Sequence, residues 1–136
     1  MTDRDYSGTP LWRKLGIRER NRIALVGAPK GLERALRPLP HGASVLGRPT
    51  GRLDVVVLFA ERRADLTRRL PRIKRMLDTA GGLWVAYPKK ASGVETDMDF
   101  GAVQEAGLNA GLVDNKSCSI DDVWSAVRFV YRLEDR

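Results

Sequence analysis

The stretch LDVVVLFAE, residues 53–61, predicts the strongest strand of the chain and decides its fold class. Its apolar residues are nearly continuous, which is typical of a strand in a parallel sheet that is covered on both faces. The stretches RIALVGAP and GLWVAYP share this pattern. We therefore expect three neighbouring parallel strands at the centre of a sheet: residues 22–28, 54–60 and 83–87.

Helical patterns lie between these strands. After residue 61, apolar residues recur at spacings of four, three and four, as one stripe of a helix: Leu66, Leu70, Ile73 and Leu77. Pro71 is expected to kink or split this helix, and Gly81-Gly82 to end it. A shorter helix is predicted in GLERALRPL. Asp99 is expected to cap a helix through FGAVQEAGLNAG, which ends at Gly111.

The remaining segments complete an α/β pattern. Residues 1–17 predict a cover segment with a short helix, in which Thr9 caps, Pro10 takes the first helical position and Gly16 ends the helix. Residues 43–46 predict a weak strand. GLVDNKSCSI and WSAVRFVYRL are separated by a short linker, which predicts an antiparallel hairpin. We expect one α/β domain over residues 1–136, with an open, mainly parallel, Rossmann-like sheet and a C-terminal antiparallel hairpin.

Composition indicates a globular protein of the cytoplasm. The chain has 136 residues, of which 43% are hydrophobic and 30% charged. Its apolar runs are far shorter than the roughly 18 residues that a membrane span needs, so no membrane partner is expected. The N-terminus lacks the apolar core of a signal peptide. The single Cys118 fits a reducing compartment.

Positive charge is concentrated in one part of the chain. Net charge is +7, with 20 basic and 8 acidic residues in positions 1–90 and 4 basic and 9 acidic residues in positions 91–136. The surplus peaks in ERRADLTRRLPRIKR and WRKLGIRERNR. It could meet nucleic acid or another polyanion, or it could be a solvated helix face, which the pattern favours.

The order of the predicted elements resembles a shortened class I methyltransferase domain over residues 22–133. Five blocks are similar to a family of uncharacterised bacterial proteins catalogued as a domain of unknown function: TPLWRKLGI, VGAPKGL, LDVVVLF, LWVAYPKKASGVETDM and AGLNAGLVDNKSCSIDDVWSAVRFVYR. That family implies no activity. The methyltransferase resemblance implies S-adenosylmethionine at a glycine-rich turn after the first strand, with an acid after the second.

The chain departs from the methyltransferase pattern at both places. Pro29 interrupts the turn and has no backbone N–H to donate. After the second strand the sequence reads SVLGRPTGR, without an acid. We therefore expect no tight binding of S-adenosylmethionine.

Candidate ligand-binding residues follow from the rule that ligands gather at the carboxyl ends of strands in open α/β sheets. Polar or turn residues stand at four predicted strand ends: Gly27, Lys30 and Gly31; Glu61; Lys89, Lys90 and Ser92; and Asn115 with Lys116. The first three groups are expected along one rim of the sheet.

The double lysine is the most suggestive of these groups. Pro88 and Gly93 restrict the loop, so the neighbouring ammonium groups of Lys89 and Lys90 should sit close together. An anion would relieve their repulsion. That anion is either a ligand phosphate or one of the chain's own acids: Glu95, Asp97 or Asp99.

Other residues carry weaker signals. His41 is expected in a surface loop, and a lone histidine and a lone cysteine far apart predict neither a zinc site nor a Cys-His pair. Trp84 and Trp124 are expected in the core. The leading hypothesis is a binding or regulatory module for an anionic or nucleotide-like ligand at the carboxyl rim of the sheet, and the sequence leaves any cofactor open. The alternatives are a minimal S-adenosylmethionine-dependent methyltransferase-like enzyme and a nucleic-acid-associated protein.

Overall fold

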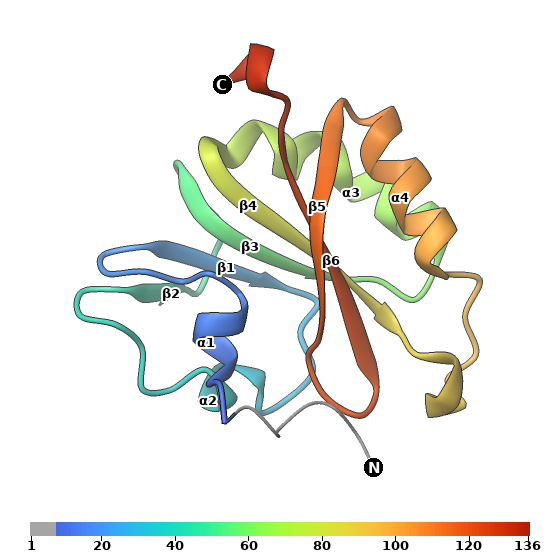
Figure 1. Ribbon diagram of the computed structural model, residues 1–136, viewed down its shortest axis with the longest axis horizontal. Coiled ribbons are helices and arrows are strands. Elements are labelled where there is room, and N and C mark those ends of the chain that lie inside the picture. Colours follow the sequence, from blue (N-terminus) through green and yellow to red (C-terminus); the bar gives the residue numbers. More distant parts are fainter. Residues whose placement is uncertain (1–7) are drawn as a thin grey trace.

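One mixed sheet organises the computed structural model, which describes residues 8–136. Its strand order is β2-β1-β3-β4-β6-β5, and only β6 runs against the others (Figure 1). The strands are β1 (Arg22–Val26), β2 (Ser44–Leu46), β3 (Leu53–Phe59), β4 (Leu77–Pro88), β5 (Leu112–Ser119) and β6 (Trp124–Tyr131). The α-helices are α1 (Leu11–Lys14), α2 (Leu32–Ala35), α3 (Arg63–Met76) and α4 (Phe100–Asn109), with short 3-10 turns η1 (Lys90–Ser92) and η2 (Leu133–Asp135).

The predicted sheet centre is confirmed. β1, β3 and β4 are adjacent and parallel, with Ile23 beside Val55 and Val57 beside Trp84. β5 and β6 form the predicted antiparallel hairpin, and β6 pairs with β4. Residues 55–59 of β3 and 81–86 of β4 are buried on both faces of the sheet, as their continuous apolar patterning requires.

The boundary between α3 and β4 was predicted wrongly. The helix ends at Met76, and Leu77 already has extended backbone angles and pairs with Leu53. Gly81 therefore does not end a helix. It lies in an irregularity of β4, where a Cβ would approach the Asp54 carbonyl oxygen to 2.7 Å. Glycine is required there because two backbones come close together.

The other helix ends agree with the sequence in part. Asp99 caps α4 as predicted, since its Oδ1 accepts the Ala102 N–H at 2.8 Å, and Gly111 follows the helix at a φ of +88°. α3 continues through Pro71 and is not split. The N-cap of α1 is Pro10 and not Thr9. Within residues 8–136 no helix has the length and apolar content to cross a membrane.

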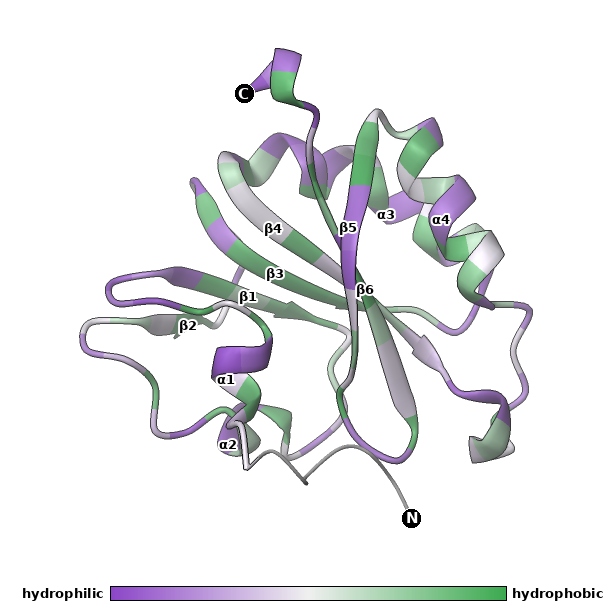
Figure 2. Cartoon of the chain, viewed as in Figure 1, coloured by the Kyte–Doolittle hydropathy of each residue, from purple (hydrophilic) through white to green (hydrophobic). Residues whose placement is uncertain are grey.

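Two apolar clusters flank the sheet. α1 and α2 cover one face, and α3 and α4 cover the other (Figure 1). Figure 2 shows the strands mostly hydrophobic and much of the helix surface hydrophilic. Trp84 and Trp124 lie in the apolar cluster beneath α1 and α2, and both are buried as predicted. The Trp84 indole Nε1 donates to the Leu15 carbonyl at 2.9 Å and so ties α1 to the sheet.

A close contact between α4 and β6 gives a stability test. A Cβ on Gly107 would lie 2.0 Å from Cε1 of the fully buried Phe129 ring. Gly107→Ala is expected to lower the free energy of unfolding by about 1–3 kcal/mol, because the ring has no room to retreat. Urea denaturation measures this change.

Gly101→Ala is the matched control on the same helix. The nearest atom to its added Cβ is the Asp99 Oδ1 at 3.6 Å, an ordinary contact. This change should leave stability unchanged or raise it by less than about 1 kcal/mol, since alanine favours helix over glycine. Equal stability of the two variants would contradict the described packing of α4 on β6.

Candidate functional site

The connection from β2 to β3 is unusually short for parallel strands. It comprises residues 47–52 and contains no helix, whereas such crossovers usually need a dozen or more residues. The three-residue length of β2 allows this short return. The connection is held by Arg22, whose Nη2 and Nε donate to the carbonyl oxygens of Thr50 and Arg52 at 2.7 and 2.9 Å.

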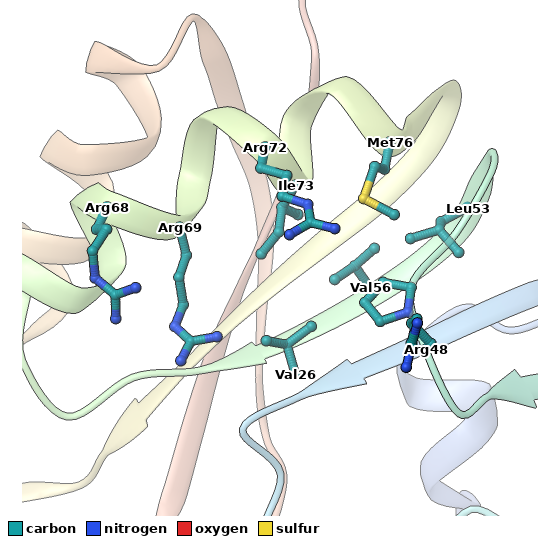
Figure 3. A pocket seen from close by; sticks show the side chains of 10 residues that line it. Val26, Arg48, Leu53, Val56, Arg68, Arg69, Arg72, Ile73 and Met76 are labelled. Carbon is teal, nitrogen blue, oxygen red and sulfur yellow. The ribbon is translucent and has the colours of Figure 1, made fainter.

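A groove lies between this connection and α3. It has a volume of about 510 Å³ and is drawn in Figure 3. Its apolar lining comprises Val26, Pro49, Leu53, Val56, Ile73 and Met76. Its polar lining consists of arginines: Arg48, Arg68, Arg69 and Arg72. We call this feature the arginine groove. Figure 3 shows that three of these arginines project from α3 toward the strands, with Arg48 on the opposite side.

The four arginines differ in how their charge is balanced. Asp65 accepts hydrogen bonds from Arg68 and, at 3.2 Å, from Arg69 Nε. Burial desolvates Asp65 and by itself raises its pKa, but the hydrogen bonds and charges of the two arginines outweigh this effect and lower the pKa. Arg48 and Arg72 make no ion pair with any residue between 8 and 136. Among residues 8–136, Arg48 and Arg72 are therefore two cations of the groove without an ion-pair partner.

The carboxyl ends of β1 and β3 form a second hollow beside the groove. It has a volume of about 590 Å³ and shares Arg69 with the groove. We call it the rim cleft. Gly27 and Glu61 line it, with the edge-to-face pair of Phe59 and Trp124, whose ring centroids are 4.9 Å apart. The strand order reverses between β1 and β3, which is where open α/β sheets place ligands.

The first predicted group is only partly at this site. Gly27 has a φ of +70°, and a Cβ there would lie 3.1 Å from the Phe59 carbonyl oxygen, so glycine permits close packing of the two strand ends. Gly31 is the N-cap of α2, a helix of only four residues, which is too short to offer an anion site. Lys30 is exposed and lines neither the arginine groove nor the rim cleft.

The lysine group lies at the carboxyl end of β4, in a separate hollow of about 420 Å³. Lys89 and Lys90 line it together with Tyr87 and the start of α4. The Lys89 ammonium donates to the Ser119 hydroxyl at 2.6 Å. The Ser92 hydroxyl donates to the Lys89 carbonyl at 2.6 Å and accepts from the Val94 N–H, so it stabilises its own turn.

Internal pairing of the lysines with nearby acids is not found among the described residues. Glu95 pairs with Arg62 at 3.3 Å, and Asp97 Oδ1 accepts the Arg63 N–H at 2.8 Å. Asp99 caps α4. All three acids therefore have other partners. The alternative in which Glu95, Asp97 or Asp99 pairs with the two lysines was wrong.

Asn115 and Lys116 were predicted at a strand end, but they lie in the middle of β5. The strand pairing is irregular here: Asp114 lies opposite Phe129 and Lys116 lies opposite the next residue, Arg128, so Asn115 has no partner in the register. Polar residues here do not end the strand because β5 is the edge strand, and Asn115 and Lys116 are exposed. Lys116 contributes instead to a hollow on the α1 face.

The remaining candidates are the lone histidine and the lone cysteine. His41 is exposed in a loop, as predicted. Burial raises the pKa of the Cys118 thiol, although three lysines oppose this effect, so the thiol is a weak nucleophile at neutral pH. In the part of the chain that the structure describes, no three His, Cys, Asp or Glu side chains are grouped to hold a metal ion.

Sequence reasoning missed the arginines of the groove. Arg69 and Arg72 were part of an Arg-rich helix interpreted mainly as a solvated face, and Arg48 was noted only as the place of an absent acid. One signal was available. Only six residues separate the weak strand at Leu46 from the strong one at Leu53, which leaves no room for a covering helix.

The sheet order, its one antiparallel strand and its solved neighbours define a class I methyltransferase-like, Rossmann-like fold. One neighbour is NcsB1, an O-methyltransferase from neocarzinostatin biosynthesis solved with S-adenosylmethionine (TM-score 0.60, 16% identity, 94% of this chain and 53% of that chain). The pyocyanin biosynthetic protein PhzM gives a TM-score of 0.64 at 11% identity over 93% of this chain and 55% of its own. The ribosomal protein L11 methylase from Lactobacillus delbrueckii subsp. bulgaricus gives 0.59 at 10% identity over 90% of this chain and 75% of its own.

The chain belongs to the family described as "Protein of unknown function (DUF3052)", whose sequence profile matches residues 47–133. A search of curated proteins finds no match. The chain spans about half the length of NcsB1 and PhzM. At these identities the likeness to solved structures shows the fold alone.

Proposed function

We propose that this protein is a binding module for an anionic ligand with a flat apolar part, of which a nucleotide is the simplest example, held in the arginine groove and the adjoining rim cleft. The observation that carries the proposal is the pair Arg48 and Arg72. Both line the same groove, and neither has an ion-pair partner among the residues described.

The chemistry of the groove suits such a ligand. A guanidinium group forms paired hydrogen bonds to phosphate and also stacks on flat rings. The half-buried apolar lining residues, Val26, Pro49 and Met76, offer a surface to the uncharged part of the ligand. Arg69 lies where the groove meets the rim cleft and so joins the two hollows.

A methyltransferase activity is less well supported. S-adenosylmethionine carries a sulfonium and an ammonium group beside a single carboxylate, so it is poorly matched to a groove whose charged lining residues are all arginines. Arg48 follows β2, where the methyltransferase resemblance implies an acid for the ribose hydroxyls. The groove itself has no carboxylate, histidine or cysteine that could act as base or nucleophile, and the carboxylates of the proposed site, Glu61 and Asp65, lie in the rim cleft.

Nucleic-acid binding by the basic surface is also less well supported. Two cations of the α3 region already have ion-pair partners: Arg62 with Glu95, and Arg68 with Asp65. These pairs reduce the field that a phosphate backbone would meet.

Isothermal titration calorimetry of the full chain with ADP, adenosine and S-adenosylmethionine tests the proposal. ADP is expected to bind, adenosine at least about tenfold more weakly, since it lacks the phosphates, and S-adenosylmethionine not detectably. Binding of ADP should weaken as salt is raised, because the contacts are ionic. Tight binding of S-adenosylmethionine with no response to ADP would overturn the proposal in favour of the enzyme.

A further inference from the structure

A second group of cations lies on the α1 face, away from the arginine groove. Arg128 of β6 stands directly across from Lys116 of β5 and from Trp84 of β4. Paired residues on neighbouring strands point to the same face of a sheet, so the two cations are cross-strand neighbours. Like charges in this arrangement are unfavourable unless something compensates them.

The Arg128 side chain has a shaped position on this face. A Cβ on Gly82 would lie 2.5 Å from Arg128 Nε, 2.7 Å from Nη2 and 2.8 Å from Cζ. The guanidinium of Arg128 therefore occupies the space that a side chain at position 82 would fill. The absence of a side chain at Gly82 therefore creates the space that lets Arg128 lie partly buried against the sheet.

The charge of Arg128 is poorly compensated among the described residues. Its only hydrogen bond there is to the Asn115 Oδ1 at 3.5 Å, the limit of such a contact. The one acid lining the same hollow is Asp54, whose Oδ2 already accepts the Arg22 N–H at 2.8 Å. Burial lowers the pKa of Arg128, and the charges of Arg136 and Arg18 lower it further.

We propose that this hollow binds the phosphate group of a small molecule. It has a volume of about 460 Å³, and its cations are Lys14, Arg18, Lys116 and Arg128. Arg128 would present its fork of N–H donors to two phosphate oxygens, and Lys116 would add a point charge across the strand pair. The proposal goes beyond the proposed function, because this hollow shares no lining residue with the arginine groove or the rim cleft.

Titration of the full chain with inorganic phosphate and with phenyl phosphate at low ionic strength tests this site. Arg128→Met is expected to weaken binding of both probes by about tenfold or more, and Lys116→Met by a smaller factor. Tighter binding of phenyl phosphate identifies a phosphate monoester as the source, and equal or tighter binding of inorganic phosphate identifies the free ion. The matched control is Arg75→Gln, which removes an exposed charge from α3 on the other face and should change neither affinity.

A second variant separates a built site from a general positive field. Gly82→Ala keeps every charge but places a methyl group where the guanidinium of Arg128 lies, so that side chain must move. Phosphate affinity is expected to fall in this variant as well, with the fold checked by circular dichroism. Unchanged affinity in Arg128→Met or Gly82→Ala, or no binding of either probe by the wild type at millimolar concentrations, would overturn the proposal. The proposal would also be overturned if neither small probe bound the wild type while Arg128→Met lost binding to a DNA oligonucleotide.

Discussion

Replacing Trp84 with alanine is expected to lower the free energy of unfolding by about 3–5 kcal/mol, the range for truncating a buried tryptophan. Trp84 is fully buried at the sheet centre, between its partners Val57 of β3 and Arg128 of β6. Its indole also donates to the Leu15 carbonyl. The substitution removes the packing and leaves that carbonyl without its donor. Urea denaturation followed by circular dichroism measures the change.

Trp84→Phe separates the two contributions. Phenylalanine keeps most of the apolar contact but cannot donate to Leu15, so the loss should be nearer about 1–3 kcal/mol, the cost of an unmade buried hydrogen bond together with a smaller ring. Hydrogen exchange should quicken at residues 15–17 in both variants. A loss below about 1 kcal/mol for Trp84→Ala would mean that α1 is not docked through this residue.

The centre of the fold could be predicted because its signal is local. Val55 to Ala60 form a continuous apolar run, and such a run has few stable places other than a strand covered on both faces. The hairpin of β5 and β6 could be predicted equally well, since the linker between the two strands is too short for a crossover connection. Gly81 shows where local reasoning stops. In sequence, a glycine can mark the end of a helix or a place where two backbones approach closely. For Gly81 the contact with the Asp54 backbone, which the sequence does not reveal, shows that the second role applies.

The candidate site was harder to predict from the sequence, because it depends on contacts between residues far apart in the chain. The lysines at 89 and 90 looked like a site because they are adjacent in sequence, and their nearest acids looked like partners. In the structure, Glu95 pairs with Arg62, Asp97 accepts the backbone N–H of Arg63, and Asp99 caps α4. Choice of a partner across more than 30 residues does not appear in any local pattern. The arginine groove exists because the connection from β2 to β3 contains no helix that would fill it.

The two proposed sites lie on opposite faces of one sheet and can be tested independently. Arg72 projects from α3 and Arg128 lies over Gly82 on the α1 face, so no single substitution removes both. A failure of phosphate binding at Arg128 would leave the arginine groove untouched. A failure of ADP binding would likewise leave the second site standing. Because ADP also carries phosphate groups, the variants separate the two sites: Arg128→Met reports on the α1 face, and Arg48→Ala with Arg72→Ala reports on the arginine groove.

The double variant Arg48→Ala, Arg72→Ala is expected to weaken ADP binding by at least about 100-fold. Each charge-assisted hydrogen bond to phosphate contributes about 1.5–3 kcal/mol, and about 1.4 kcal/mol corresponds to a factor of ten. Both side chains are exposed and unpaired within residues 8–136, so stability should change by only about 0.5 kcal/mol. Calorimetric titration gives the affinity, and thermal melts without ligand give the stability.

Two matched variants decide what a loss of ADP binding means. Arg34→Ala, Arg75→Ala removes the same net charge from exposed positions outside the groove and should change the affinity less than about threefold, as screened surface charges do. Lys89→Ala, Lys90→Ala tests the rival hollow at the end of β4. If the lysine variant loses ADP while Arg48→Ala, Arg72→Ala keeps it, the ligand site lies beside α4 and the arginine groove is a solvated surface. If the arginine variant alone loses ADP, the groove between the β2–β3 connection and α3 is the place where this fold holds its ligand.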